Sequence, residues 1–260
     1  MIAYYKNSRG QTINFMKSPY RAVEADWYDA DWEETGAEYE RKVTLDVLGK
    51  TSSELISNLE NLYQIIAVDA EEGAYGKLCV NDTWLRCQIS SSKKSEWTSF
   101  VSAQVELVFA APALSWVREM RKQFSVRQET TLDGLNFPFN FPFNFAPSQK
   151  GQVSWNIEHP TSSEFQMIVY GPCVNPRILI NGYPYEVFTT LDAGDYMIID
   201  SQSDTVYKYL NNGTVQNLFH NRGLEHSIFE KIPSGLLNFN WSGDFGFDLT
   251  LYLERREAAW

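Results

Sequence analysis

The sequence LNFPFNFPFNFAP, at positions 135–147, repeats Phe-Pro-Phe-Asn and lies between two parts of the chain that differ in pattern. An interior proline removes a backbone donor and clashes with the preceding turn, so this segment cannot be helical. Successive side chains of an extended strand point to opposite faces. The segment is therefore expected to carry five phenyl rings on one face, those of Phe137, Phe139, Phe141, Phe143 and Phe145.

The prolines and the phenyl face restrict how this segment packs. Pro138 and Pro142 have the same parity, so one edge of an extended strand lacks two donors, and we expect an edge strand or a bound ribbon. Five exposed rings would promote aggregation, so they must lie against a surface. Two interpretations follow: a stiff inter-domain connector that packs on its own domains, or a strap whose rings contact another subunit.

The residues before the repeat predict strands and one helix. RKVTLDVLG at 41–49 alternates apolar and polar residues, which is typical of a half-buried strand. Thr51 and Glu54 form a capping box, and apolar residues then recur at helical spacing, so we expect an amphipathic helix on a sheet. Residues 76–90 predict a hairpin, and residues 99–112 predict a long strand that ends at a proline.

The residues after the repeat predict only strands. Asn181-Gly182 and Asn212-Gly213 are preferred hairpin dipeptides, and turn signals recur about every eight to twelve residues. This spacing indicates a β-sandwich. The fold class is thus predicted to be mainly β, with an α+β first domain at 1–135, a connector at 136–149 and a β-sandwich at 150–260.

No recognisable catalytic or ligand-binding motif occurs. The three histidines match no zinc-site spacing, and the sequence has no nucleophile elbow and no phosphate-binding loop. We therefore predict no catalytic, cofactor-binding or metal-binding residues, no cofactor and no enzymatic activity. A net charge of −11 without a basic cluster argues against binding to nucleic acid or an anionic membrane. No export signal or bilayer-spanning stretch is recognised, so the 3 cysteines are expected to be free thiols.

An acidic segment, EADWYDADWEETGAEYE at 24–40, contains four aromatic residues and no basic residue. One interpretation is a solvated loop between two strands. The other is a protein contact, because Trp and Tyr are enriched at interface hot spots. Trp27, Tyr28 and Trp32 are accordingly the candidate residues for a contact with another subunit or a partner.

Four further segments of the second half carry a family resemblance when taken with the Phe-Pro repeat. They are GPCVNPRILING at 171–182, LDAGDYMIIDSQSDTVY at 191–207, NLFHNRG at 217–223 and IPSGLLNFNWSG at 232–243. In this order, after an N-terminal half with one amphipathic helix, the whole chain resembles the distal tail protein (Dit) family. That family comes from siphoviruses of Gram-positive hosts, their prophages or phage-tail-like bacteriocins.

The resemblance implies a structural role at the tip of a phage tail. The first domain would be a tail-tube-like split β-barrel with one flanking helix, forming a homohexameric hub ring around a channel through which DNA only passes. The second, galectin-like domain would project outward as an attachment platform. The implied partners are the tail tube protein, the tape-measure protein, the tail-associated hub or lysin protein and a receptor-binding protein. The protein would be made in the bacterial cytoplasm and reside in the virion, with no membrane contact.

A monomeric carbohydrate-binding or adhesive β-sandwich module is the alternative, suggested by the aromatic-rich second half. Galectins bind galactosides through His-x-Asn-x-Arg and Trp-x-x-Glu-x-Arg strands. The nearest segments here are HNR at 220–222 and NWSGDF at 240–245, and the spacing fails in both. The likeness to galectins therefore predicts the fold of the second domain, but it does not predict a galactoside-binding site.

Overall fold

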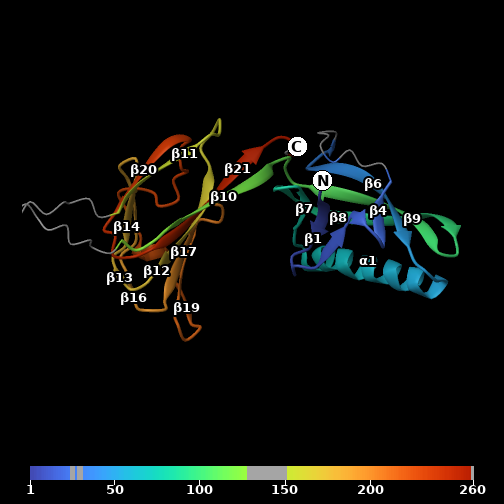
Figure 1. The fold of residues 1–260 in the computed structure, drawn as a ribbon, viewed down its shortest axis with the longest axis horizontal. Coiled ribbons are helices and arrows are strands. Elements are labelled where there is room, and N and C mark those ends of the chain that lie inside the picture. Colours follow the sequence, from blue (N-terminus) through green and yellow to red (C-terminus); the bar gives the residue numbers. More distant parts are fainter. Residues whose placement is uncertain (24–26, 28–31, 128–150, 259–260) are drawn as a thin grey trace, which may run out of the picture. The chain divides into compact units, whose positions relative to one another are not determined.

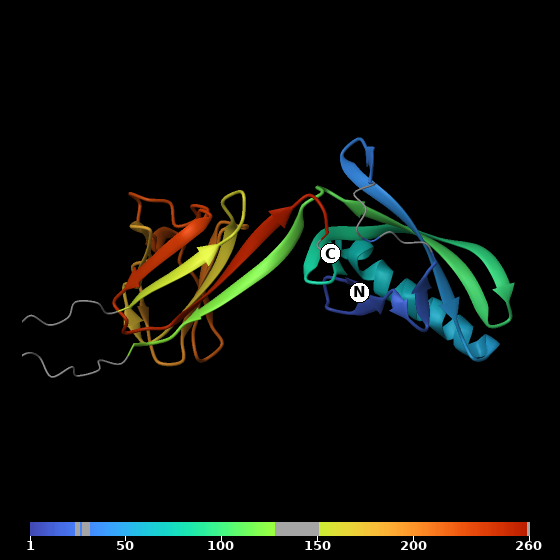
Figure 2. The same cartoon turned by 45° about the horizontal axis from the view of Figure 1, so that its top comes forward.

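The computed structural model describes residues 1–23, 27, 32–127 and 151–258. The chain divides into two compact units (Figures 1 and 2). Unit 1 contains residues 1–119 together with the C-terminal residues from 254, and unit 2 contains residues 120–253. Each unit has its own hydrophobic core.

Unit 1 is a curled antiparallel sheet with one α-helix among its described residues. Strand β8 pairs with β7, β9 and β10, and β9 pairs in turn with β6, along which β4 and β5 lie. β1 joins β7 to β2. The elements are β1 (Ala3–Lys6), β2 (Thr12–Asn14), β3 (Met16–Lys17), β4 (Tyr20–Ala22), β5 (Glu33–Thr35), β6 (Glu38–Leu48), α1 (Ser52–Glu72), β7 (Gly76–Val80), β8 (Thr83–Ser99), β9 (Ser102–Ala111) and β10 (Trp116–Phe124).

Helix α1 begins and ends where its capping residues predict. The Thr51 hydroxyl accepts a hydrogen bond from the backbone N–H of Glu54 at 3.2 Å, and the Glu54 carboxylate accepts one from Lys50 N–H at 2.8 Å. Gly73 ends the helix in the left-handed region, at φ 61°. The apolar stripe of α1 packs into the core of unit 1 through Leu55, Leu59, Leu62, Ile65 and Ile66. The helix predicted from the capping box is confirmed.

Unit 2 is a β-sandwich, as predicted. One layer has the order β19-β18-β17-β12-β21-β10 and the other the order β11-β20-β14-β15, beside a small β13–β16 pair. Each large apolar side chain buried between the layers contributes about 1.5–3 kcal/mol to stability. The strands are β11 (Gln152–Ile157), β12 (Glu164–Tyr170), β13 (Cys173–Val174), β14 (Arg177–Ile180), β15 (Tyr183–Glu186), β16 (Thr190–Leu191), β17 (Tyr196–Asp200), β18 (Thr205–Tyr209), β19 (Val215–Asn217), β20 (Gly235–Trp241) and β21 (Phe247–Arg255), with a 3-10 turn η1 at Phe219–Asn221.

The chain changes unit within β10, between Glu119 and Met120, whereas the sequence places the first boundary at 135. Phe124 is the physical reason, because it lies in the core of unit 2, where its ring stacks on Phe247 with centroids 4.3 Å apart. The return to unit 1 after Leu253 also differs from the predicted range 150–260. The predicted connector at 136–149 lies outside the described residues.

Candidate functional site

The most prominent candidate for an assembly surface is the long hairpin formed by β8 and β9. Residues 83–87 of β8 pair with β7, and residues 88–99 pair with β9. Within the described part of the chain, no strand pairs with the other side of residues 88–99, which we call the open edge. The ladder shifts register at three places, between Ile89 and Ser91, between Lys94 and Glu96, and between Trp97 and Ser99. Such bulges are frequent at sheet edges, where they reduce indiscriminate strand pairing.

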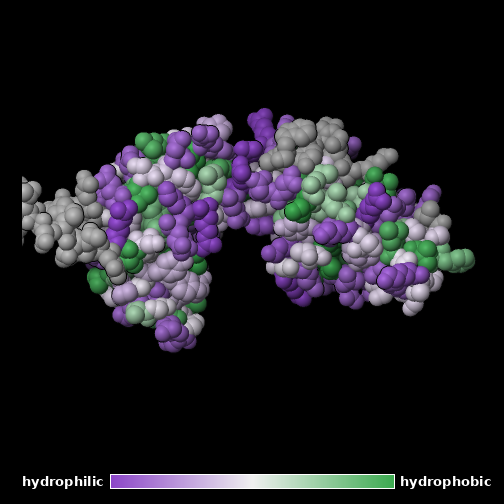
Figure 3. Space-filling model, viewed as in Figure 1, coloured by the Kyte–Doolittle hydropathy of each residue, from purple (hydrophilic) through white to green (hydrophobic). Residues whose placement is uncertain are grey.

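The end of this hairpin exposes apolar side chains. Trp97 is 61% exposed and Phe100 86% exposed, and Val101 beside them is 39% exposed. We call residues 97–101 the hairpin tip. Figure 3 shows hydrophobic atoms at that end of unit 1. Leaving large Trp and Phe side chains exposed to water is energetically unfavourable. Such exposed rings are typical of surfaces that contact another protein.

The hairpin tip is held in position by the start of α1. The Ser52 hydroxyl donates a hydrogen bond to the carbonyl of Phe100 at 3.1 Å, and Gly49 N–H donates to the carbonyl of Val101 at 2.9 Å. These bonds fix the turn between β8 and β9, so the exposed rings lie on an ordered support. Ordered anchors lose less conformational entropy when they bind.

A second edge of the same sheet is acidic. β5 pairs with the start of β6, and both Glu33 and Glu34 on it are exposed. The open edge of β8 instead carries exposed Lys93 and Lys94. β9 and β6 separate the lysine pair from the glutamate pair, although the open edge also carries exposed Glu96, and β4, on the same side of β6 as β5, carries exposed Arg21. Unlike pairs of this kind on separate edges suit head-to-tail association of copies.

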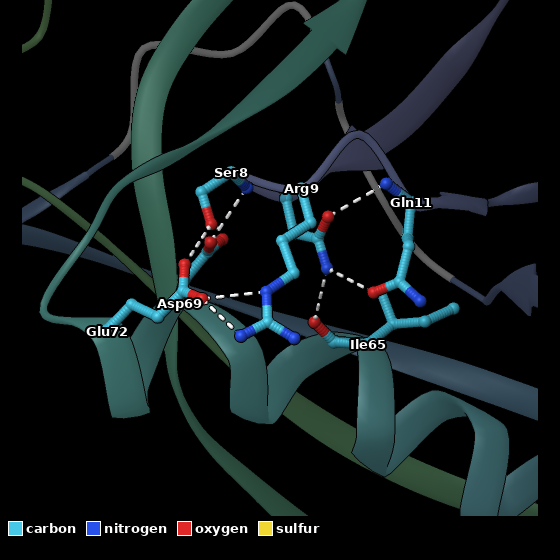
Figure 4. Close-up of polar contacts among 7 residues, drawn as sticks. Ser8, Arg9, Gln11, Ile65, Asp69 and Glu72 are labelled. Atoms are coloured by element: carbon cyan, nitrogen blue, oxygen red, sulfur yellow. Dashed lines mark hydrogen bonds and ion pairs between the residues drawn. The ribbon is translucent and has the colours of Figure 1, made fainter.

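A polar cluster ties α1 to the first strand and its turn (Figure 4). Asp69 of α1 is fully buried and accepts hydrogen bonds from the Tyr5 hydroxyl and from Ser8 N–H, the latter at 2.8 Å. Arg9 donates to Glu72 at 2.7 Å, and the Asn7 amide donates to the carbonyl of Ile65 at 3.0 Å. Burial and the bond to Asp69 raise the pKa of Tyr5, so its hydroxyl stays a donor. The cluster therefore fixes the helix that supports the hairpin tip.

Two of the three aromatic residues predicted to contact a partner are buried in their own chain. Trp27 is 2% exposed and stacks on Phe15 with centroids 5.2 Å apart. Trp32 is 9% exposed, and its indole N–H has no hydrogen-bond partner among the described residues. Tyr28 lies outside those residues. The core of unit 1 thus takes up both indoles, and Tyr28 stays a candidate for a contact with another subunit.

The phenyl residues of the repeat are not described, and the cysteines form no metal site with the described residues. Phe137, Phe139, Phe141, Phe143 and Phe145 lie outside the described residues. Cys79, Cys87 and Cys173 are free, and burial raises the pKa of each thiol, that of Cys173 to about 11. Across the described ranges no cluster of His, Cys, Asp and Glu has the arrangement of a metal site. In those ranges no helix is long and apolar enough to cross a membrane.

The hairpin tip was missed in the sequence because Ser-rich SEWTSFVS shows no periodicity that separates an exposed turn from a strand. Its signal was the pair Trp97 and Phe100 flanked by small polar residues. Only the pairing of β8 with β9 identifies them as the end of a hairpin.

Comparison with solved structures finds this fold in phage tail proteins. A chain of the phage P2 baseplate, in its activated conformation with calcium, aligns with a TM-score of 0.59 and 13% identity, covering 96% of this chain and 98% of that one. The same baseplate with strontium gives the same values. The Dit protein of phage SPP1, described as a paradigm of the hub adsorption apparatus in phages that infect Gram-positive bacteria, aligns with a TM-score of 0.53 and 9% identity, covering 98% and 100%. No protein-family model and no curated protein matches the sequence.

These alignments confirm the fold that the resemblance predicts. The chain has the Dit-like fold over nearly its whole length, with both the curled sheet and the β-sandwich included.

Proposed function

We propose that this chain is a structural, non-catalytic component of a phage tail tip, of the distal tail protein type. One observation carries the proposal: the fold aligns over 98% of this chain and 100% of the Dit protein of phage SPP1. A match from end to end, including both units, is more informative than a shared single domain, because β-sandwiches alone serve many functions.

In this proposal unit 1 forms a homohexameric ring around a channel. The lysine pair and the glutamate pair on separate edges of its sheet support head-to-tail contacts, which close into a ring when the rotation between copies permits. The hairpin tip supplies apolar anchors for a neighbouring copy or for the adjoining tail tube protein. A net charge of −11 suits a conduit through which DNA passes without being held.

Unit 2 is then the attachment platform of the tail tip. A receptor-binding protein and the tail-associated hub or lysin protein would attach there or below the ring, and the tape-measure protein would end nearby. The Phe-Pro segment at 136–149 remains a proposed connector or strap. The protein would reside in the virion after synthesis in the host cytoplasm.

Negative-stain electron microscopy and native mass spectrometry test the ring. We expect six-fold rings with a central hole, and we expect the double variant Trp97→Ser, Phe100→Ser to shift the population toward monomers. Tyr63→Ser is the matched control, because Tyr63 is 59% exposed on α1 outside the hairpin tip. Monomers at every concentration, with or without tail tubes as a template, would contradict the proposal and favour the monomeric carbohydrate-binding module.

A further inference from the structure

The outer face of the four-stranded sheet in unit 2 carries amides and a hydroxyl where surface strands usually carry charges. The register places Gln152 opposite Asn240 and Ser154 opposite Asn238. These four side chains and Asn156, two residues further along β11, are exposed and point to one face. We call these five residues the amide face.

The residues of the amide face do not serve to stabilise the sheet. Asn is disfavoured in strands, and an exposed position offers it no compensating packing. Strands β11 and β20 contain no charged residue, although 21% of the whole chain is charged. Within the described residues, only Ser154 and Asn238 bond to each other, at 2.7 Å, whereas the amides of Gln152, Asn156 and Asn240 are unpaired.

The amide face continues across β14 and β15 into a cavity. Leu179 lies opposite Asn240 on one side and Pro184 on the other, and Arg177 lies opposite Glu186. Arg177, Pro184 and Glu186 also line a cavity of about 540 Å³. This volume falls within the range of small-molecule sites, roughly 300–1,000 Å³. Unpaired amides and a cavity are thus parts of one continuous surface.

The far wall of the cavity is fixed by hydrogen bonds. Phe188 N–H donates to the carbonyl of Asn221 at 2.7 Å, and the Asn221 amide donates back to the carbonyl of Phe188 at 3.0 Å. The Tyr183 hydroxyl donates to the carbonyl of Ser227 at 2.9 Å. The Phe188 ring, 49% exposed, lines this wall together with His220. A wall formed before binding reduces the entropy that a ligand must overcome.

We propose that the amide face and this cavity bind a neutral oligosaccharide. Sugar hydroxyls both donate and accept hydrogen bonds, and amide side chains offer both functions in return. The cavity lining also pairs Arg177 with Glu186 and contains Arg222 and Glu225, so its charges cancel and it favours hydroxyls over ionic groups. The Phe188 ring provides an apolar surface for the C–H face of a sugar ring.

The site differs from that of galectins. Neither the segment at 220–222 nor that at 240–245 has the galectin spacing, yet His220 and Asn240 both belong to the surface formed here. Register and strand order bring these residues together. The glycan proposal does not depend on the ring proposal. A hexamer that binds no glycan would contradict only the glycan site, and a monomer that binds glycans would contradict only the ring.

A glycan array probed with the full-length protein, followed by calorimetry with a neutral oligosaccharide that it retains, tests the proposal. We expect neutral glycans to be retained. The double variant Gln152→Ala, Asn240→Ala and the single variant Phe188→Ala are each expected to weaken binding about tenfold, since a few hydrogen bonds or one ring contact correspond to that range.

Gln216→Ala is the matched control, because this exposed amide lies on β19 of the other layer. It should bind like the parent protein, and all variants should keep the parent unfolding temperature. If Phe188→Ala lowers stability, Arg177→Gln serves as a second variant that tests whether the cavity contributes to glycan binding. Retention of no glycan, retention of acidic glycans alone, or binding of equal strength in all variants would overturn the proposal. Binding of a tail protein that masks this face, without glycan binding, would overturn it as well.

Discussion

At the residue scale, each unit has a buried carboxylate that joins separate elements through polar contacts. Asp69 joins α1 to β1 through the Tyr5 hydroxyl in unit 1. Asp195 in unit 2 accepts a hydrogen bond from Asn211 N–H at 2.9 Å and pairs with the Lys208 ammonium at 3.1 Å. Lys208 also donates to the carbonyl of Thr190 at 2.7 Å. Buried polar groups with all partners present orient their surroundings, and each becomes costly when a partner is removed.

Tyr5→Phe is expected to destabilise unit 1 by about 1–3 kcal/mol, because it leaves the buried Asp69 carboxylate without one donor. Urea unfolding at neutral pH measures the loss. The raised pKa of Tyr5 means that this contribution is complete below the ordinary tyrosine value of about 10 and is lost as pH rises through the folded value. Tyr63→Phe, at an exposed position, is the control, and equal losses in both variants would refute the role of the bond.

Asp195→Asn is expected to lower the stability of unit 2 at neutral pH. The stability of the variant should also change less than that of the parent protein as the pH falls. The Asn211 N–H, followed by Lys208, lowers the pKa of Asp195, so its contribution is present above the ordinary aspartate value of about 3.9. The contribution is lost as pH falls through the lowered folded value. Urea unfolding at a series of pH values from neutral to acidic, with hydrogen exchange as the readout for unit 2, measures this change. Asp244→Asn, at an exposed turn, should retain the parent pH profile.

At the element scale, the β8–β9 hairpin combines an open edge with a fixed apolar end. Its bulges and lysines guard against indiscriminate pairing, while the rings of the hairpin tip offer a specific contact. Lys93, Lys94 and Glu96 are exposed on the open edge, and Glu33 and Glu34 are exposed on β5, beyond β9 and β6. The lysine pair on this edge thus offers a contact for an acidic segment of a neighbour.

Charge reversal tests this complementarity. Lys93→Glu with Lys94→Glu should weaken self-association about tenfold or more, because like charges then meet across the contact. Native mass spectrometry at low salt measures the change, which added salt should reduce. Combining the reversal with Glu33→Lys and Glu34→Lys should restore association. Failure of the fourfold variant to regain association, with its fold intact, would exclude a contact between these two edges.

At the scale of the whole molecule, each unit has a separate core, and the chain crosses between them twice, after Glu119 and after Leu253. Phe124 decides which unit the later half of β10 belongs to. It is 3% exposed and contacts Phe239 and Phe247, with centroids 4.6 Å and 4.3 Å apart. The core of unit 2 therefore includes a residue that precedes the Phe-Pro repeat.

Phe124→Ala is expected to destabilise unit 2 by about 3–5 kcal/mol, the usual result of removing a buried phenyl ring. Hydrogen exchange with mass spectrometry reports the two units separately. Protection should fall across β11, β20 and β21 and remain at the parent level in α1 and β6. A loss shared equally by both units would show that they unfold as one. Phe100→Ala, which removes an exposed ring, should leave both unchanged.

Local signals in the sequence predicted the parts of the fold that depend on neighbours along the chain. The capping box at Thr51 and Glu54 defined the start of α1, and Asn181-Gly182 and Asn212-Gly213 defined turns, because caps and turns involve residues a few positions apart. Alternation along 41–49 predicted β6. The order of these elements, with the Phe-Pro repeat and the segments of the second half, carried the resemblance that implied the Dit-like fold.

Tertiary structure decided what depends on residues far apart in sequence. It placed Trp27 and Trp32 in the core of unit 1, exposed Trp97 and Phe100, and put the change of unit after Glu119, whereas the sequence suggested 135. It also brought the amides of β11 beside those of β20, more than 80 positions later along the chain. The periodicity of a sequence shows which positions are apolar and how they are spaced along the chain. Which surface covers that side chain is set by strand order and register, and these are fixed only when the whole sheet packs.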